Sequence, residues 1–183
     1  MLGFLTAIRG RFIADRYAGR LAENSKVLDV GCGSGIVAAI LKERFRLDLT
    51  GADTARRLER DLPFVLIPED GELPFAERTF AAAMLNDVLH HVRDQAGLLR
   101  RTLRTADQVL IFEVEPAGRL LSCFDRVINW LHYGGLPAPE TYRDAAGWRR
   151  WLAETGFSGE VEPAGKPAWW YPFEHVIITV RHG

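Results

Sequence analysis

Short apolar blocks alternate with segments of mixed polarity along most of the chain. The apolar blocks have the length of buried strands, and the segments between them place apolar side chains at helical spacing. The pattern predicts strands at 27–30, 47–53, 64–70, 79–86, 108–114, 159–162 and 175–180. It predicts helices at 36–45, 94–104, 119–133 and 144–154. Strands that alternate with helices are typical of a parallel sheet with helices on both faces.

The segment before the first strand, residues 1–24, is expected to be helical. It places apolar side chains on one stripe and basic ones around it, namely Leu5, Ile8, Phe12 and Leu21 with Arg9, Arg11, Arg16 and Arg20. We interpret the segment as a helix packed on the sheet, and contact of a basic amphipathic helix with anionic lipid is the alternative. The helix expected after Asp53 is compressed, because residues 56–61 are largely charged and Pro63 follows.

Composition and charge limit the classes of function. The 183 residues, 48% of them hydrophobic, suffice for one well-buried domain and are too few for two. The 23 basic and 24 acidic residues leave no basic excess for nucleic acid as the main partner. The two cysteines form no C-x-x-C pair, so no disulfide framework is expected. With no membrane-spanning apolar run and no signal-peptide pattern, cytoplasm is the expected location.

A glycine-rich turn follows the first predicted strand, with Gly31, Gly33 and Gly35 at alternate positions. Glycines let a backbone adopt positive φ and approach a ligand closely, and the next helix directs its first N–H groups into the same gap. The spacing disfavours a dinucleotide-binding turn, because Ile36 stands where its third glycine belongs. It also disfavours a phosphate-binding P-loop, whose Gly-Lys ending is missing. The alternative is an ordinary sharp turn of an α/β protein.

Asp29 directly before this Gly-x-Gly-x-Gly turn resembles the first motif of the class I S-adenosylmethionine-dependent methyltransferases. Further stretches follow in the order of that family. Asp53 ends the second strand about 20 residues beyond the turn, and Asp70 and Gly71 precede Leu-Pro-Phe. After Asn86, the run Val-Leu-His-His-Val at 88–92 is similar to the signature of small-molecule, type 11-like members. These matches cover about residues 25 to 115.

The resemblance implies an α/β fold with a Rossmann-like, mostly parallel seven-stranded sheet, an antiparallel last strand and helices on both faces. It implies S-adenosyl-L-methionine as the cofactor. Asp29 and the glycine turn would hold its methionine part, Asp53 its ribose, and Asp70 with Gly71 its adenine. The expected cofactor-binding residues are Asp29, Gly31, Cys32, Gly33, Gly35, Asp53, Asp70, Gly71 and Asn86.

The implied chemistry is in-line displacement of a methyl group from a sulfonium, in which orientation and desolvation supply most of the catalysis. A general base is needed only when the acceptor arrives protonated. The candidates are His90, His91 and Glu115, together with Glu113. Alternatively, the histidine pair shapes the start of a helix beside the pocket. Adjacent histidines do not have metal-ligand spacing on a helix, so no catalytic metal is expected.

Acceptor recognition is expected in the later part of the chain. The predicted helix 119–133 carries a polar stripe that includes Asn129 and His132, which is either an acceptor-binding face or the solvent face. Trp169 and Trp170 lie in a proline-flanked loop and either wall the acceptor site or cover the sheet edge. The expected organisation is a single methyltransferase domain over 1–183, with a helical segment at 1–24, a cofactor-binding core at 25–115 and acceptor-side helices with a final hairpin at 116–183.

The function expected from the sequence is methyl transfer to a small-molecule or lipid-like acceptor. The short N-terminal segment suggests an open site that suits a bulky acceptor or is closed by a second subunit, so a homodimer is possible. A noncatalytic S-adenosylmethionine-binding module that supports a partner enzyme is the first alternative. A nicotinamide-dependent oxidoreductase is the second.

Overall fold

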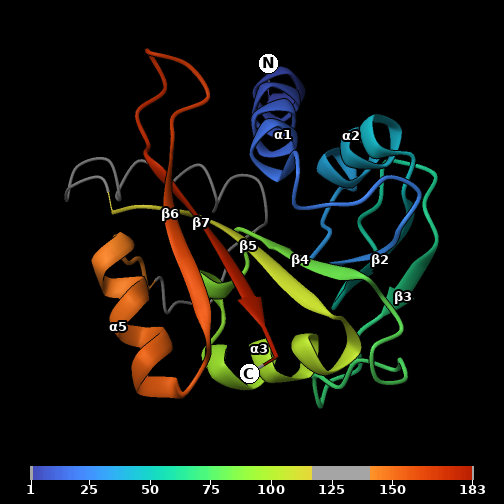
Figure 1. Cartoon of the computed structure of the whole chain (residues 1–183). Coiled ribbons are helices and arrows are strands. Elements are labelled where there is room, and N and C mark those ends of the chain that lie inside the picture. The colour runs from blue at the N-terminus through green and yellow to red at the C-terminus, as the bar shows by residue number, and fades with distance from the viewer. Residues whose placement is uncertain (1, 117–140, 183) are drawn as a thin grey trace.

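A computed structural model describes residues 2–116 and 141–182, with side chains from residue 7 onward (Figure 1). Its described strands form one sheet in the order β3-β2-β1-β4-β5-β7-β6. Neighbours from β3 to β5 pair in parallel, and β7 is antiparallel to β5 and to β6. The predicted sheet with an antiparallel last strand is therefore confirmed. The strands are β1 Lys26–Val30, β2 Asp48–Asp53, β3 Phe64–Leu66, β4 Ala82–Asn86, β5 Gln108–Val114, β6 Gly159–Gly165 and β7 His175–Arg181.

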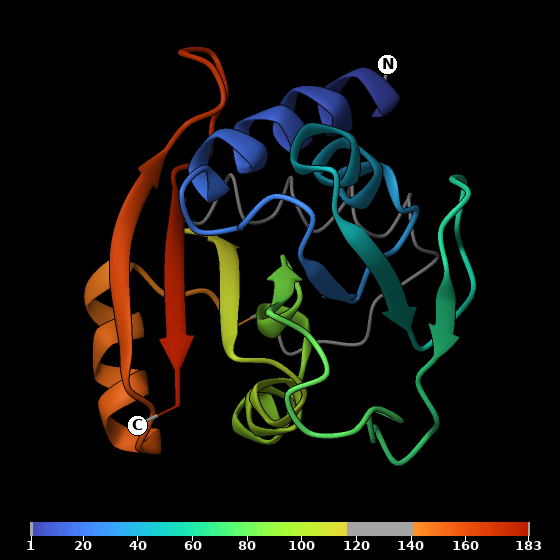
Figure 2. The ribbon, with the colours of Figure 1, turned by 45° about the vertical axis from the view of Figure 1, so that its right-hand side comes forward.

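Helices cover both faces of the sheet (Figures 1 and 2). The helices α1 (Leu2–Tyr17) and α2 (Ile36–Phe45) pack on one face, where they share an apolar cluster with Leu110 and Phe112 of β5. The helices α3 (Gln95–Thr105) and α5 (Ala145–Thr155) pack on the other, against Val109 and Ile111. Successive β5 side chains thus serve opposite cores, as the pleat of a strand buried on both faces requires.

The N-terminal helix packs on the sheet and ends at Tyr17, before the expected boundary at residue 24. Phe12, Ile13 and Tyr17 of α1 are buried against the sheet. Gly10 lets α1 approach α2, because a Cβ built there would lie 2.6 Å from Cδ1 of Ile40. No helix within the described ranges combines the length and apolarity needed to cross a bilayer.

Several predicted elements differ from the observed ones. Residues 54–63 form no helix and instead pack over the glycine turn, where the Glu59 N–H donates to the Ser34 carbonyl at 2.9 Å. The third strand stops at Leu66, because the chain turns at Pro68–Gly71. The fourth begins at Ala82, and Phe80 makes only an isolated bridge. The predicted helix 119–133 lies outside the described residues.

Side-chain caps fix where the two later helices begin. Asp94 accepts a hydrogen bond from the Gly97 N–H and starts α3, and Asp144 accepts one from the Gly147 N–H and starts α5. Such caps satisfy backbone donors that the first helical turn leaves unpaired. Gly156, with φ of 78°, ends α5. Between β4 and α3, a single 3-10 turn, η1, spans Leu89–His91.

Candidate cofactor site

The candidate site lies where the strand order reverses. From β1 the chain proceeds to β2 on one side, while β4 and β5 lie on the other, so the carboxyl ends of β1 and β4 flank the switch point. Open α/β sheets bind ligands in the crevice outside these ends. Asp29, Asp53 and Asn86 each come from the last residues of their strands. The topology therefore brings together three of the predicted site residues.

The glycines of the turn after β1 serve different purposes. Gly31 has φ of +77°, and a Cβ there would lie 2.5 Å from Cγ2 of Val88, so glycine lets the segment after β4 close in. Gly33 has φ of +52°, and a Cβ there would meet no atom within 4 Å. The Gly33 backbone thus borders open space that a ligand can approach. The Cys32 side chain packs toward Gly51, and burial raises the pKa of its thiol to about 12, which makes it an inert spacer.

Asp53 ties the glycine turn to the end of β2. Its Oδ2 accepts a hydrogen bond from the Gly33 N–H at 2.9 Å, and its Oδ1 accepts one from the Ala55 N–H at 3.3 Å. Only 9% of the residue is exposed. This carboxylate is thus held in a fixed orientation beside the open space at Gly33.

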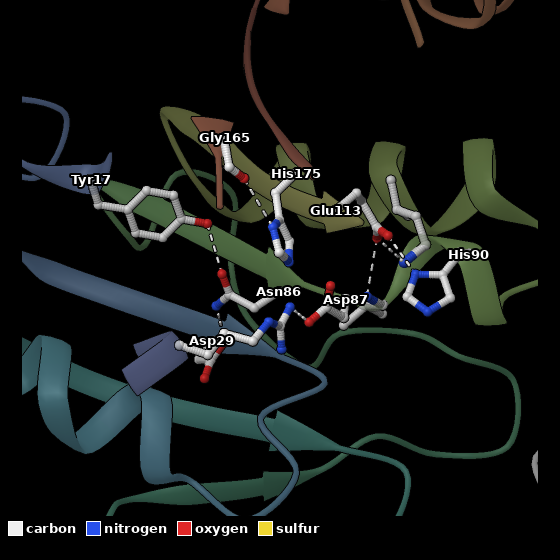
Figure 3. Close-up of polar contacts among 11 residues, drawn as sticks. Tyr17, Asp29, Asn86, Asp87, His90, Glu113, Gly165 and His175 are labelled. Atoms are coloured by element: carbon white, nitrogen blue, oxygen red, sulfur yellow. Dashed lines mark hydrogen bonds and ion pairs between the residues drawn. The ribbon is translucent and has the colours of Figure 1, made fainter. Parts of the chain in front are cut away.

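Three side chains, the buried Tyr17 and Asp29 and the half-buried Asn86, form a hydrogen-bonded chain from α1 to β1 (Figure 3). The Tyr17 hydroxyl donates to Oδ1 of Asn86 at 2.8 Å, and Nδ2 of Asn86 donates to Oδ1 of Asp29 at 3.3 Å. Burial raises the pKa of Asp29 to about 7; the Asn86 hydrogen bond opposes this shift and the Asp53 charge adds to it. Burial, and then the charges of Asp29 and Glu113, raise the pKa of Tyr17. A buried carboxylate of this kind is stabilised by a cationic ligand group.

A second contact joins α1 to the end of β4. Asp87 directly follows Asn86, adopts φ of 53°, and forms an ion pair with Arg9 of α1 (Figure 3). The other carboxylate oxygen of Asp87 is buried and has no hydrogen-bond partner among the described residues. The α1 helix therefore contacts two consecutive residues at the switch point.

Glu113, in β5, organises the segment that contains the two histidines. One oxygen accepts hydrogen bonds from the N–H groups of Val88 and Leu89, at 3.1 and 2.8 Å, and the other contacts Nδ1 of His90 (Figure 3). The His90 ring is buried and stacks on Tyr142 with centroids 4.9 Å apart. His91 packs against His90, with centroids 3.9 Å apart. Both histidines thus belong to the packed turn after β4.

Asp87, His90 and Glu113 place potential metal-ligand atoms within 4.8 Å of one another. The contacts of these side chains give another explanation of the cluster. Asp87 pairs with Arg9, and the Glu113 carboxylate is shared by two backbone N–H groups and the His90 ring. A network with these partners accounts for the negative charges without an ion.

The remaining predicted residues lie farther from this network. Asp70 is exposed in the turn after β3, where it accepts a hydrogen bond from the Glu72 N–H, and Gly71 follows with φ of +74°. Glu115 accepts a hydrogen bond from the Ala145 N–H at the start of α5. Trp169 and Trp170 lie in the loop between β6 and β7. Asn129 and His132 fall outside the described residues.

The sequence pattern did not assign Arg9, Tyr17 or His175 to the site. His175 begins β7 beside the end of β5, where Nδ1 lies 3.2 Å from the Gly165 carbonyl oxygen (Figure 3). Burial, and then the Arg9 charge, lower its pKa to about 3, so the ring is neutral. The eight-residue spacing of Arg9 and Tyr17 places both on one face of a helix, which was the available signal.

The doubly wound order, the antiparallel β7, the glycine turn after β1 and the acids near the carboxyl ends of β1 and β2 together define a class I S-adenosylmethionine-dependent methyltransferase fold. The family model of the methyltransferase domain matches residues 7–161. The chain therefore belongs to this family, whose cofactor is S-adenosylmethionine. The buried Asp29 carboxylate and the open space at Gly33 fit a cofactor with a cationic amino acid part.

Two solved structures with this fold hold S-adenosylhomocysteine or S-adenosylmethionine, and both are of one protein. Phosphoethanolamine N-methyltransferase 2 of Haemonchus contortus, in complex with phosphomonomethylethanolamine and S-adenosylhomocysteine, is 15% identical with a TM-score of 0.67. The match covers 93% of this chain and 52% of that one, so this chain spans about half of the Haemonchus protein.

Two further solved structures show the range of proteins with this fold. A Thermotoga maritima methyltransferase described as a possible histamine N-methyltransferase is 14% identical with a TM-score of 0.65, covering 97% and 92% of the two chains. The [4+2]-cyclase SpnF is 17% identical with a TM-score of 0.66, covering 92% and 79%. A search of curated proteins finds no match.

Proposed function

We propose that this domain transfers a methyl group from S-adenosylmethionine to a small-molecule or lipid-like acceptor at the carboxyl edge of its sheet. The observation that carries the proposal is the hydrogen-bonded chain of Tyr17, Asn86 and Asp29 beside the open backbone at Gly33. Asp29 supplies a negative charge and Gly33 leaves room, which is what an amino acid cation with a bulky substituent requires. We place the reaction in the cytoplasm.

The cofactor supplies a methyl group on a sulfonium, which is a good leaving group. In the proposal, Asp29 and Asn86 bind the methionine ammonium, and Gly31, Cys32, Gly33 and Gly35 contribute backbone contacts. Asp53 accepts from the ribose hydroxyls, and Asp70 with Gly71 lies at the adenine. These contacts orient the methyl group for in-line displacement, and preorganisation of this kind supplies on the order of 7–11 kcal/mol.

A proton acceptor is required when the acceptor atom carries a proton. The Glu113 carboxylate at Nδ1 of His90 favours the tautomer whose Nε2 carries the lone pair. His90 is therefore the first candidate base, with His91 beside it. Glu115 is the third, although its carboxylate already holds the start of α5. A positioned base contributes roughly 10²–10⁴-fold to the rate.

Acceptor selection is proposed for the later part of the chain. Trp169 and Trp170 lie beyond the end of β5, because Gly165 and Val114 both pair with His175. Asn129 and His132 are the polar candidates. The proposed division is a helical segment at 1–24, a cofactor core at 25–115 and an acceptor side at 116–183, although strands from both parts share one sheet.

A noncatalytic S-adenosylmethionine-binding module that supports a partner enzyme is the competing function. The cyclase SpnF has the same fold and is described by a different reaction, so the fold by itself does not require methyl transfer. The oxidoreductase alternative is set aside, because the family and its cofactor are established.

The discriminating experiment is an acceptor-library screen in which S-adenosylhomocysteine release and the mass of each acceptor are measured together. Methyl transfer should appear for at least one acceptor class and disappear in Asp29→Ala. Cofactor binding without transfer to any acceptor, and transfer only after a partner enzyme is added, would favour the module.

A further inference from the structure

We propose that the loop between β6 and β7, together with the exposed side of α1, docks this domain on the surface of an anionic lipid bilayer. The loop, residues 166–174, is called the aromatic loop below. The docking itself does not depend on methyl transfer. Its use, which is to bring the site to a lipid-like acceptor, rests on the proposed function.

The aromatic loop exposes tryptophan to solvent. Trp169 is 93% exposed and Trp170 46% exposed. Within the described residues, the other large apolar side chain with high exposure is Leu66, at the end of β3. Two adjacent exposed indoles are unfavourable in water, whereas indole is enriched at membrane interfaces, where its apolar ring is buried and its N–H remains hydrated.

The base of the loop is ordered by aromatic contacts. The Tyr171 ring lies 5.7 Å from His175 and 6.0 Å from Phe173, measured between centroids. His175 in turn stacks on Phe112 of the core. The tryptophans thus belong to an anchored loop, and this loop extends beyond the sheet (Figures 1 and 2). An anchored loop loses less conformational entropy on docking than a free one.

A basic helix lies beside this loop. The α1 helix runs next to the base of the aromatic loop in both views (Figures 1 and 2), and a Cβ built on Gly165 would lie 3.9 Å from Nη2 of Arg16. The α1 helix carries three arginines and one aspartate, whereas the whole chain has a net charge of −1. Arg9 is paired with Asp87. Arg11 and Arg16 are exposed. Positive charge is therefore concentrated on the element that adjoins the tryptophans.

Tryptophan beside exposed arginine matches an anionic bilayer better than a second copy of this chain. Charges near an anionic surface add attraction, and apolar side chains insert at the headgroup level. A second copy would bring the same arginines together and repel. The surface also lies at the carboxyl edge of the sheet, because β7 begins opposite the end of β5. Docking there faces the cofactor edge toward the lipid.

The test is co-sedimentation of the full chain with vesicles of phosphatidylcholine alone or with about one third phosphatidylglycerol, with intrinsic tryptophan fluorescence as a second readout. We expect binding to the anionic vesicles that is weakened by added salt. The double variant Trp169→Ala and Trp170→Ala should reduce partitioning by about tenfold. Arg11→Gln with Arg16→Gln should reduce it by about fivefold per charge.

Matched controls keep the result specific. Leu66→Ala removes an exposed apolar side chain elsewhere on the sheet, and Arg150→Gln removes an exposed arginine from α5, on the opposite face. Neither should change partitioning. Equal partitioning of the tryptophan variant and the parent, or no binding to anionic vesicles, would overturn the proposal. A dimer that the tryptophan variant dissociates, without vesicle binding, would assign the surface to a second copy and also overturn it.

S-adenosylhomocysteine affinity, measured by calorimetry on the same proteins, separates the two proposals. Absence of anionic vesicle binding by the parent chain, with intact cofactor affinity, contradicts the docking surface and leaves methyl transfer standing. Vesicle binding by a protein that binds cofactor and methylates nothing in the acceptor screen contradicts the proposed function and leaves the docking surface standing.

Discussion

Asp29 combines deep burial with a neighbouring carboxylate, Asp53, and this makes its charge depend on pH near neutrality. Its pKa lies at about 7 in the folded, ligand-free protein, against 3.8 for an ordinary aspartate. Between these two values the folded state binds more protons than the unfolded state, so its contribution to the free energy of unfolding falls as pH rises. His175, whose pKa is lowered to about 3, contributes in the opposite direction over part of that range.

The first prediction concerns this proton. Asp29→Asn should remove the Asp29 contribution that makes the free energy of unfolding fall between about pH 4 and pH 7. The effect is read as the difference between the variant and the wild type, because the contribution of His175 is the same in both. In the wild type, cofactor affinity should increase as the pH is raised toward 7, by up to about tenfold per pH unit. The reason is that an ammonium ligand favours the ionised carboxylate. Calorimetry in buffers of different ionisation enthalpy would detect the released proton. An affinity independent of pH would contradict the assignment of Asp29.

The second prediction concerns Asp53. Asp53→Ala should weaken S-adenosylhomocysteine binding by about 1.5–3 kcal/mol, the usual range for hydrogen bonds to a charged group. Because Asp53 also accepts the Gly33 N–H, the glycine turn should become more mobile, and hydrogen exchange at Gly33 should report this. Asp48→Ala, at the exposed start of the same strand, is the control. Unchanged affinity would remove Asp53 from the site.

The third prediction separates the structural role of Glu113 from its effect on His90. Glu113→Gln can still accept from Val88 and Leu89 but presents an N–H to His90, which inverts the tautomer. We expect a stability loss of about 1–3 kcal/mol and, when His90 is the base, a rate loss of about 10²-fold with a changed pH profile. Cofactor affinity should be retained. A loss of stability with an unchanged rate profile would leave His90 as a packing residue. Asp107→Asn, in an exposed ion pair with Arg78, is the control.

At the scale of elements, α1 contributes more to the site than an apolar stripe suggests. Arg9 and Tyr17 reach Asp87 and Asn86, so one helix contacts two consecutive residues at the end of β4. The contact between Tyr17 and Asn86 joins residues that are 69 positions apart in the sequence. Periodicity indicates which face of a helix is apolar, but it does not identify the polar partner that the face meets.

The fourth prediction tests this link. Tyr17→Phe keeps the ring in the core and removes the hydroxyl that donates to Asn86. We expect S-adenosylhomocysteine affinity to fall by about 0.5–1.5 kcal/mol, the net value of one hydrogen bond. Tyr171→Phe makes the same atomic change in the aromatic loop and should leave the affinity unchanged. Equal affinities for Tyr17→Phe and the wild type would show that Asn86 is oriented without α1.

At the scale of the whole molecule, the sequence predicted the sheet and most of the cofactor edge because both follow from local signals. Apolar runs fix the strands, and parallel topology then brings Asp29, Asp53 and Asn86 to one edge. The sequence predicted a compressed helix after Asp53, whereas residues 54–63 form none. Leu58 and Leu62 instead pack beside Gly35, and this tertiary contact has no local sequence signal. The exposure of Trp169 could not be predicted from the sequence either, because an aromatic run is compatible with both a buried and an exposed loop.

The most direct test of the account is the melting temperature of the full chain with S-adenosylhomocysteine, compared with a nicotinamide dinucleotide at the same concentration. At about 100 times the dissociation constant the ligand adds about 2.7 kcal/mol, which for a domain of this size corresponds to about 5–11 °C. We predict this increase for S-adenosylhomocysteine, a smaller one for Asp53→Ala, and none for the dinucleotide. Stabilisation by the dinucleotide alone would contradict the assignment of the site.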